Sequence, residues 1–244
     1  RVLNSPPVLM EALADYFMTK YKPKTVMTVA SRDNDGAAAQ TTVVRKLLQG
    51  KVTFLPEESA LMADTDFTAL STKIASQKPN LVLITMNDSA AANIIVQARQ
   101  AGVGNDVQFV SNNAAASPTF LKIGGKAVEG TVMATDALPE LRSDTLTKNY
   151  IAAFQKKFGA PPDQWASIGY TIVKLYSRAI AGIKGPVTRQ GVRDAIVATK
   201  NVPVVIGDGK TNFSFDAERN PVYKPIVLTI KDQKFRSEEH TSEL

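Results

Sequence analysis

The order of apolar segments along the first two-thirds of the chain limits its fold more than any other feature. Apolar stretches with strand character occur at 25–30, 51–55, 81–86, 107–110 and 128–134. Segments with helical spacing or a helix-start signal lie before and between them, at 6–21, 37–48, 67–76, 90–101 and 117–124. Strands that alternate with helices predict a parallel, doubly wound α/β sheet, in which a helix connects each strand to the next. These crossover connections are expected to be right-handed.

The last third of the chain departs from this alternation. Helices are expected at 143–158, 163–183 and 188–199, followed by short β segments at 212–215 and 225–231. The helix at 163–183 carries an apolar stripe that needs a sheet to cover it: Ile168, Ile172, Leu175, Tyr176 and Ala179. No strand series of its own follows this stripe. We therefore expect a second, incomplete lobe whose sheet belongs to a part of the protein before Arg1.

The composition argues against several classes of function. Lys and Arg number 29 against 23 Asp and Glu, a formal net charge of +6, but the bases are scattered along the chain. A nucleic-acid partner is therefore not expected. With no Cys and a single His, His240, thiolate metal sites, thiol catalysis and His-based triads are not expected either. We expect no cofactor and no catalytic site, and no segment reaches the ~20 apolar residues of a membrane span.

The last nine residues, 236–244, are expected to be foreign to the protein. They have no apolar period, and they resemble the translation of a sequencing adapter. Reading the DNA beyond Phe235 in an independently prepared clone tests this prediction. At the other end, the chain opens at Arg1 as if cut from a longer protein.

Polar residues gather where three of the predicted strands end. The candidate ligand-binding residues are Asn34, Asp35, Asn87, Asp88, Asn112 and Asn113. Ligands bind at the carboxyl ends of the strands in open α/β sheets, so these residues predict one polar rim that hydrogen-bonds a small polar solute. A second interpretation is that Asn and Asp side chains cap the helices that follow. Each loop is expected to combine both roles.

Two other patterns were weighed as sites. Asp33 and Asp35 have the residue type for a metal or acid–base pair, but an Asp-rich turn before a helix is more often a cap. Gly207 and Gly209 flank Asp208 without the Lys-Ser/Thr pair of a phosphate loop, so a turn is expected there.

Six short segments occur in the order and spacing of a known family, at 22–24, 33–36, 66–68, 78–82, 97–102 and 127–130. With them the chain resembles the periplasmic solute-binding proteins of branched-chain amino acid ABC transporters. These form the leucine/isoleucine/valine-binding family, which has the type I periplasmic-binding fold. The resemblance covers about 1–235, most of the chain.

This resemblance implies a domain organisation and a function. The family fold has two doubly wound α/β lobes joined by a hinge of three crossovers, with the solute bound between the lobes. Carried over, 1–135 forms a complete lobe with the hinge entry, 136–222 a partial second lobe, 223–235 the last crossover, and 236–244 the foreign tail. The implied protein is a periplasmic monomer without enzymatic activity. It delivers a small solute to an ABC transporter membrane permease when its lobes close, and its signal peptide lies outside this chain.

Three positions depart from the amino-acid-binding pattern of that family. Asp35 stands where the amino-acid-binding members have a Tyr, and Asn87 stands where they have a second aromatic residue. Asn113 stands where these members have a Glu that binds the ammonium group of the ligand. A neutral Asn is a weaker partner for a buried ammonium than Glu, although Asp35 can take over that role. The solute therefore stays open among an amino acid, a short amide, a urea-like solute, and a carboxylic or aromatic acid.

Two further functions stay open beside solute delivery. The same fold serves as the ligand-sensing domain of receptors and transcription regulators, which a DNA-binding module or a membrane span outside this chain would identify. The third is a doubly wound enzyme, for which the sequence offers no nucleophile, metal site or phosphate loop.

Overall fold

The computed structural model describes residues 1–238, and the end of the predicted foreign tail, with His240, lies outside the described residues. The described chain divides into two compact units. Unit 1 consists of Arg1–Ser5 and Asp136–Ile226, and unit 2 consists of Pro6–Thr135 with the residues from Val227 on. The chain therefore passes from one unit to the other three times.

Unit 2 is built on a sheet dominated by parallel strands. Its strands are β1 (Thr25–Ser31), β2 (Thr53–Phe54), β3 (Glu58–Ala60), β4 (Leu81–Thr85), β5 (Gln108–Ser111), β6 (Val132–Thr135), β7 (Ile226–Lys231) and β8 (Lys234–Ser237). The order in the sheet is β2-β1-β4-β5-β6-β7-β8, and β3 also pairs with β1. The pairs from β2 to β6 are parallel, and β7 and β8 form an antiparallel pair at the end of the sheet.

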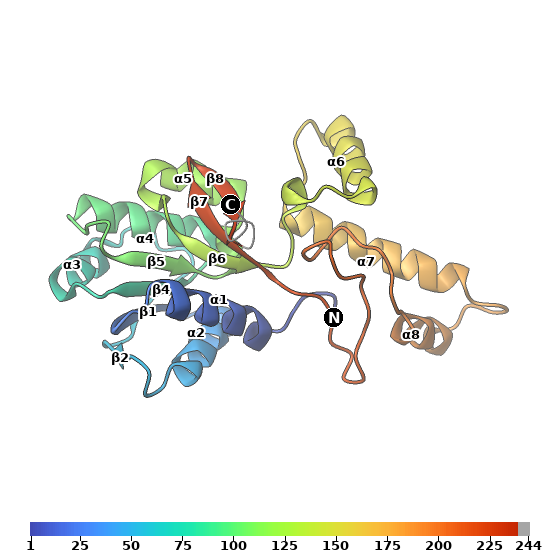
Figure 1. Cartoon of the computed structure of the whole chain (residues 1–244), viewed down its shortest axis with the longest axis horizontal. Helices are drawn as coiled ribbons and strands as arrows, with labels where there is room; N and C mark the ends of the chain where they lie inside the picture. Colours follow the sequence, from blue (N-terminus) through green and yellow to red (C-terminus); the bar gives the residue numbers. More distant parts are fainter. Residues whose placement is uncertain (239–244) are drawn as a thin grey trace. The chain divides into compact units, whose positions relative to one another are not determined.

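Helices cover both faces of this sheet, as Figure 1 shows for unit 2. They are α1 (Pro6–Lys20), α2 (Asp35–Leu47), α3 (Thr68–Gln77), α4 (Asp88–Gln100) and α5 (Pro118–Gly124). On one face, α1 and α2 bury Phe17 and Val44 against sheet residues such as Leu83. Helices α3, α4 and α5 lie on the other face. All five residues of β4 are buried, as the unbroken apolar run of this strand predicted.

Unit 1 consists mainly of helices and extended segments. Its helices are α6 (Thr145–Phe158), α7 (Gln164–Ala181) and α8 (Arg189–Val197), with the short 3₁₀ helix η3 (Pro139–Leu141) before them. The apolar stripe of α7 splits in two. Ile168 and Leu175 pack with Phe213 in the core of this unit. Ala179 is also buried, but Ile172 and Tyr176 are 38% and 50% exposed, so the described residues leave two of the five stripe residues uncovered.

Four elements differ from the sequence prediction. The β segment expected at 212–215 is not a strand, and only two of its residues form isolated β-bridges, Phe213 with Val202 and Phe215 with Pro221. Strand β3 was missed because Glu58 and its neighbours have low β propensity, and the strand forms by pairing with the end of β1. Strand β6 begins only at Val132, because the 3₁₀ helix η2 (Gly125–Val128) occupies the start of the predicted strand. Strand β8 was missed, and it includes Arg236 and Ser237. These two residues belong to the predicted foreign tail, whose origin stays a prediction.

Candidate functional site

The carboxyl ends of three neighbouring strands bring the six predicted site residues to one edge of the unit 2 sheet, called here the carboxyl edge. Strand β4 pairs in parallel with both β1 and β5, so the loops that follow these strands leave the sheet on the same side. The candidates in these loops are Asn34, Asp35, Asn87, Asp88, Asn112 and Asn113. Two of these side chains cap helices and one contacts a neighbouring loop, whereas the Asp35 carboxylate and Asn112 Oδ1 have no partner among the described residues.

Two of the asparagines cap helices. Asn34 Oδ1 accepts a hydrogen bond of 2.9 Å from Ala37 N at the start of α2, and Asn87 Oδ1 accepts one of 2.8 Å from Ala90 N at the start of α4. Asn87 Nδ2 also donates to the carbonyl oxygen of Met62 at 2.9 Å. These bonds satisfy backbone N–H groups that a helix start leaves without a partner. Both side chains therefore have the capping role that the sequence analysis weighed.

The aspartates that follow β1 and β4 connect neighbouring loops. Asp88 Oδ2 accepts a 2.7 Å hydrogen bond from Ser117 Oγ, which joins the β4 loop to the start of α5. Asp33 Oδ1 accepts from Ser31 Oγ at 2.8 Å and from Met62 N at 2.9 Å. The hydrogen bonds from Ser31 and Met62 hold the pKa of Asp33 below its ordinary value, so this carboxylate is charged at neutral pH.

The carboxylate of Asp35 has no hydrogen-bond or ion-pair partner among residues 1–238. Asp35 is the exposed first residue of α2, where the helix dipole favours a negative charge. Its carboxylate is available to an ammonium or another hydrogen-bond donor of a solute.

Asn112 is the candidate that the fold leaves unsatisfied. It follows β5, is 4% exposed, and its Oδ1 has no hydrogen-bond partner among residues 1–238. Asn113 begins the 3₁₀ helix η1 (Asn113–Ala115) beside it. A buried polar atom without a partner costs about 1–3 kcal/mol. A ligand N–H or O–H that reached Asn112 Oδ1 would remove this cost.

Other buried polar side chains at the same strand ends do have partners. Thr85 Oγ1 lies 2.6 Å from Thr41 Oγ1, and Ser111 Oγ donates to the carbonyl oxygen of Ile84 at 3.1 Å. Asn112 is thus distinguished from its neighbours by the missing partner, and not by burial alone.

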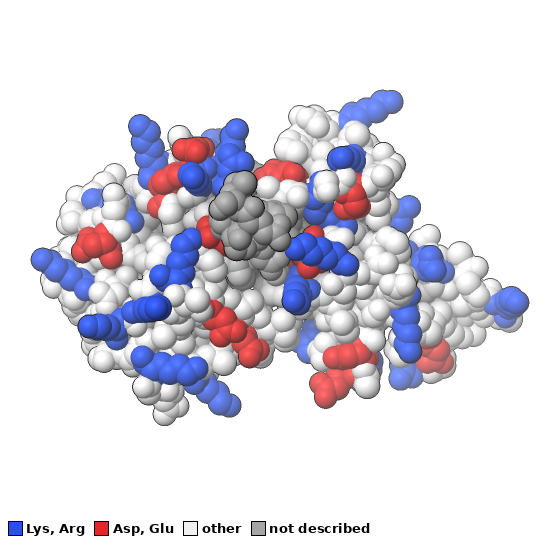
Figure 2. Space-filling model, in the orientation of Figure 1, with Lys and Arg blue, Asp and Glu red and all other residues white. Residues whose placement is uncertain are grey.

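The two edges of the unit 2 sheet differ in charge. Asp33, Asp35 and Asp88 lie in the loops of the carboxyl edge, where Arg32 is the one basic residue. Four exposed lysines lie in the segments before strands, at the opposite edge: Lys22, Lys24, Lys51 and Lys78. Figure 2 shows Lys and Arg side chains along the left and lower-left end of the molecule, over unit 2. The carboxyl edge therefore has a local field that attracts the positive part of a solute.

Unit 1 contains a buried carboxylate that was not among the predicted site residues. Asp136 is fully buried, and its Oδ1 accepts hydrogen bonds from Asn4 N at 3.1 Å, Asn4 Nδ2 at 2.9 Å and the Tyr223 hydroxyl at 2.8 Å. Burial raises the pKa of Asp136 above its ordinary value, although the bonds from Tyr223 and Asn4 oppose this. The sequence signal that could have indicated this buried carboxylate is the position of Asp136 directly after an apolar strand. This carboxylate holds together three distant segments of unit 1.

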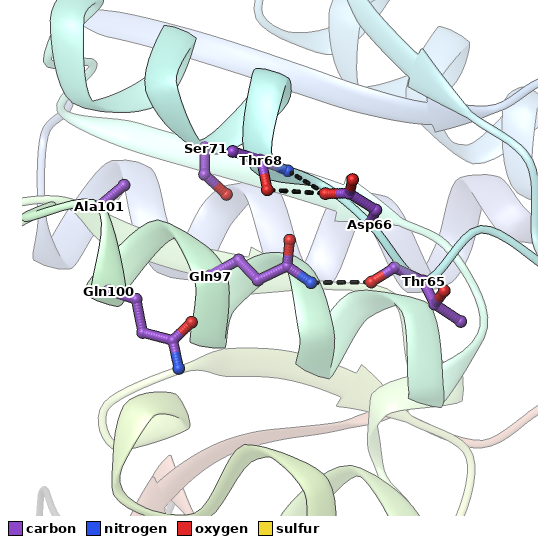
Figure 3. Close-up of a pocket in the computed structure, with 7 residues that line it drawn as sticks. All are labelled: Thr65, Asp66, Thr68, Ser71, Gln97, Gln100 and Ala101. Carbon is purple, nitrogen blue, oxygen red and sulfur yellow. Dashed lines mark hydrogen bonds between the residues drawn. The ribbon is translucent and has the colours of Figure 1, made fainter.

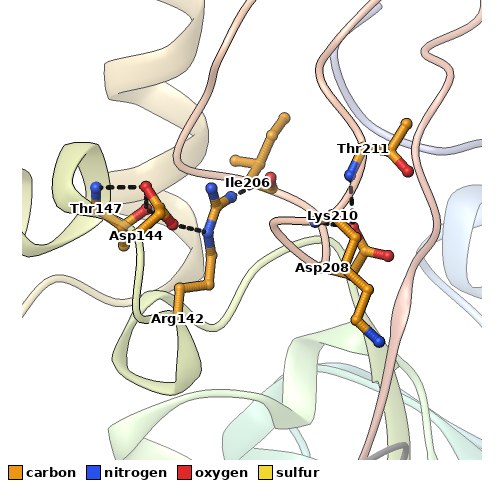
Figure 4. Close-up of polar contacts among 7 residues, drawn as sticks. All are labelled: Arg142, Asp144, Thr147, Ile206, Asp208, Lys210 and Thr211. Atoms are coloured by element: carbon orange, nitrogen blue, oxygen red, sulfur yellow. Dashed lines mark hydrogen bonds and ion pairs between the residues drawn. The ribbon is translucent and has the colours of Figure 1, made fainter.

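A second polar cluster of unit 1 is drawn in Figure 4. Arg142 Nε pairs with Asp144 Oδ2 at 2.9 Å, and Arg142 Nη1 donates to the carbonyl oxygen of Ile206 at 2.6 Å. Asp144 Oδ1 in turn accepts from Thr147 N at 2.9 Å and caps α6. Asp208 accepts from the backbone N–H groups two and three residues further on, which makes the predicted turn there. These bonds are structural.

Two cavities in the described chain contain none of the six candidates. One, of about 580 Å³, is lined by residues of α3, α4 and the loop before α3. The other, of about 280 Å³, lies in unit 1 against α7 and 202–205. Within residues 1–238, no three His, Asp or Glu side chains are grouped to hold a metal ion. The described helices include none that is both long and apolar enough to span a bilayer.

Solved structures with a similar fold come from several bacteria. The leucine-binding protein LivK from Thermotoga maritima superposes with a TM-score of 0.84 at 21% identity, over 96% of this chain and 65% of that chain. The branched-chain amino acid transporter substrate-binding protein LivJ from Streptococcus pneumoniae, in complex with isoleucine, gives 0.84 at 20% identity, over 96% and 64%. An ABC transporter solute-binding protein from R. palustris, in complex with benzoate, gives 0.82 at 19% identity, over 96% and 62%.

The first of these similarities, with LivK, covers nearly all of this chain but only 65% of the solved protein, so the chain spans slightly less than two-thirds of its length. No sequence among curated proteins matches the chain. The similar structures confirm the expected type I periplasmic-binding fold. The family model described as periplasmic binding protein matches residues 1–231, nearly the whole chain. This protein therefore belongs to the periplasmic binding protein family, as the sequence resemblance indicated.

Proposed function

We propose that this protein is an extracytoplasmic solute-binding protein that delivers a small polar solute to the permease of an ABC transporter. Membership of the periplasmic binding protein family supports this proposal. Two proteins of similar fold hold small solutes, isoleucine in one and benzoate in the other. The three connections between the units act in this proposal as the hinge through which solute binding changes the conformation that the permease recognises.

The binding surface in this proposal is the carboxyl edge of unit 2. The observation that carries it is the buried Oδ1 of Asn112, which lacks a donor in the described chain. A solute N–H or O–H group would satisfy this oxygen. The free carboxylate of Asp35 lies in a loop of the same edge and would bind a positively charged group.

The solute class follows from these two partners. A neutral amide oxygen and an exposed carboxylate both accept hydrogen bonds, which suits an amino acid or a related amide, because its N–H groups are donors. A carboxylic acid fits Asn112 through an O–H group only when it is protonated, and the acidic loops would repel its anion. We therefore place amino acids and amides before carboxylic acids as the solute.

Replacing Asn112 with Ala tests the site. In the full-length protein, this change is expected to weaken solute binding by about 1–3 kcal/mol, roughly 5–150-fold in Kd, because the solute donor loses its acceptor. Isothermal titration calorimetry with isoleucine, propionamide and benzoate covers the three solute classes. Asn105→Ala is the matched control, because Asn105 is exposed in the loop before β5, at the opposite edge of the same sheet.

Two outcomes would contradict the proposal. Affinity that is unchanged in both Asn112→Ala and Asp35→Ala would exclude the carboxyl edge as the site. Binding of none of the three probes by the wild-type protein would exclude these solute classes. Far-UV circular dichroism of each variant shows that a weakened affinity does not come from unfolding.

A further inference from the structure

A polar groove lies between α3 and α4 of unit 2, on the helical layer of this unit. Figure 3 shows the side chains that line it, and the cavity has a volume of about 580 Å³. The lining residues are Thr65, Asp66, Thr68, Ser71, Gln97, Gln100 and Ala101. None of them belongs to the carboxyl-edge site described above.

Ser71 is the unusual member of this lining. It lies at the end of the first turn of α3, is 1% exposed, and its Oγ has no hydrogen-bond partner among the described residues. Figure 3 shows its hydroxyl directed from α3 toward α4, into the groove. Two exposed hydroxyls of the same helix behave differently: Thr72 Oγ1 donates to the carbonyl oxygen of Thr68 at 2.9 Å, and Ser76 Oγ donates to that of Lys73 at 3.0 Å. The buried hydroxyl is thus the one of these three without a partner, although burial makes a missing partner costly.

The rim of the groove is held in place without a ligand. Gln97 Oε1 accepts from Phe67 N at 2.7 Å, and Gln97 Nε2 donates to the carbonyl oxygen of Thr65 at 2.8 Å. Asp66 Oδ1 accepts from both the backbone N–H and the hydroxyl of Thr68, at 2.9 and 2.7 Å. A pre-formed rim lowers the entropy cost of binding, because its side chains are already ordered.

Three polar groups of the lining remain available to a ligand. They are the Ser71 hydroxyl, the amide of Gln100, which makes no hydrogen bond within the described chain, and Asp66 Oδ2. The hydrogen bonds from Thr68 hold the pKa of Asp66 below its ordinary value, so Asp66 offers a charged acceptor at neutral pH. No Lys, Arg or aromatic residue is among the lining residues, so they offer no positive charge to an anion and no ring for stacking.

We propose that this groove binds a small neutral polyhydroxy molecule, a polyol or a monosaccharide. Neighbouring hydroxyl groups both donate and accept hydrogen bonds. One ligand of this class can therefore donate to Asp66, accept from Ser71 and pair with the amide of Gln100 at the same time. An ammonium ligand can donate to Asp66, but it offers no acceptor for the proton of the Ser71 hydroxyl or for the N–H groups of Gln100.

Titration of the full-length protein with glycerol, sorbitol and glucose tests this proposal, with ¹H–¹⁵N NMR spectra as the readout. We expect saturable shift changes in the backbone signals of 65–71 and 97–101. Ser71→Ala is expected to weaken binding at least about fivefold, because the ligand loses a buried partner. Ser76→Ala is the matched control on the same helix and is expected to leave the affinity unchanged. Asn112→Ala is also expected to leave it unchanged, which separates this groove from the carboxyl-edge site.

The thermal stability of Ser71→Ala gives a second readout. Exchanging an unsatisfied buried hydroxyl for a methyl group is expected to keep or raise the melting temperature of the ligand-free protein. A lowered melting temperature would mean that the hydroxyl is already bonded in the folded protein, and it would overturn the proposal. Absence of saturation at millimolar concentrations of all three probes would overturn it as well.

Discussion

Replacing Asp136 with Ala is expected to destabilise unit 1 by about 2–4 kcal/mol, because the change leaves buried donors without an acceptor. The donors are both N–H groups of Asn4 and the hydroxyl of Tyr223. The chain has a single Trp, and Trp165 lies on α7 of unit 1, so its fluorescence reports the unfolding of this unit. Urea unfolding followed at this residue gives the change in stability. An unchanged midpoint would show that the Asp136 cluster does not hold unit 1 together.

The conservative variant Asp136→Asn adds a pH test. Burial raises the pKa of Asp136 in the folded state above its ordinary value, so the folded state binds a proton more tightly than the unfolded state does. The contribution of Asp136 to the unfolding free energy is therefore largest at low pH. This contribution declines as the pH rises from the ordinary pKa of an aspartate through the raised pKa of Asp136. Asp136→Asn retains an acceptor oxygen and is expected to lose this decline.

Two other carboxylates of unit 1, Asp144 and Asp216, have lowered pKa values, so their contributions to stability change with pH in the opposite direction. Burial raises the pKa of Asp144, but the hydrogen bonds from Thr147 and Arg142 outweigh it, and the net pKa is lowered. The pKa of Asp216 is lowered by hydrogen bonds from Asn220. Both groups lose their contribution as the pH falls. The difference between the wild-type protein and Asp136→Asn isolates Asp136, and an identical pH dependence in the two proteins would contradict its raised pKa.

Replacing Leu83 with Ala is expected to destabilise unit 2 by about 2–5 kcal/mol, through lost burial and the cavity that remains. Leu83 is fully buried in β4, in the middle of the sheet, and packs in the cluster formed with α1 and α2. Far-UV circular dichroism follows the loss of the sheet and its helices. Leu61→Ala is the matched control, because Leu61 is 40% exposed in the same unit, and its effect is expected within about 0.5 kcal/mol.

Asp136→Ala and Leu83→Ala together test whether the two units unfold separately. Leu83→Ala is expected to leave the Trp165 transition unchanged, since this residue lies in the other unit. Asp136→Ala is expected to shift that transition and to leave most of the circular dichroism change of unit 2 in place. Equal shifts of both signals in both variants would mean that the chain unfolds as one cooperative body.

The sequence predicted the framework of unit 2 because the relevant signals are local. An unbroken apolar run gave β4, and helix-start residues such as Asn34 and Asn87 gave the starts of α2 and α4 to within two residues. Parallel strands place their carboxyl ends on one side, so the common position of the six candidates followed from the order of elements alone. Strand β3 was missed because its pairing with β1 depends on tertiary contacts.

The sequence could not distinguish the candidate side chains from one another. Asn34, Asn87 and Asn112 all stand directly after or near strand ends, yet two of them accept backbone hydrogen bonds and the third keeps a buried oxygen without a partner. Which amide has a spare acceptor depends on the dihedral angles of the loop and on neighbours from other segments. The role of Asp136 was missed for the same reason, since its donors come from residues at both ends of the chain.

Hydrogen–deuterium exchange of the full-length protein, with and without the tightest-binding of the three solute probes, tests the central claim most directly. Solute bound at the carboxyl edge is expected to slow amide exchange in 32–37, 86–90 and 111–115. Exchange in 102–107, at the opposite edge of the same sheet, is expected to stay unchanged. Protection that appeared only outside the three loops would contradict the proposed binding surface.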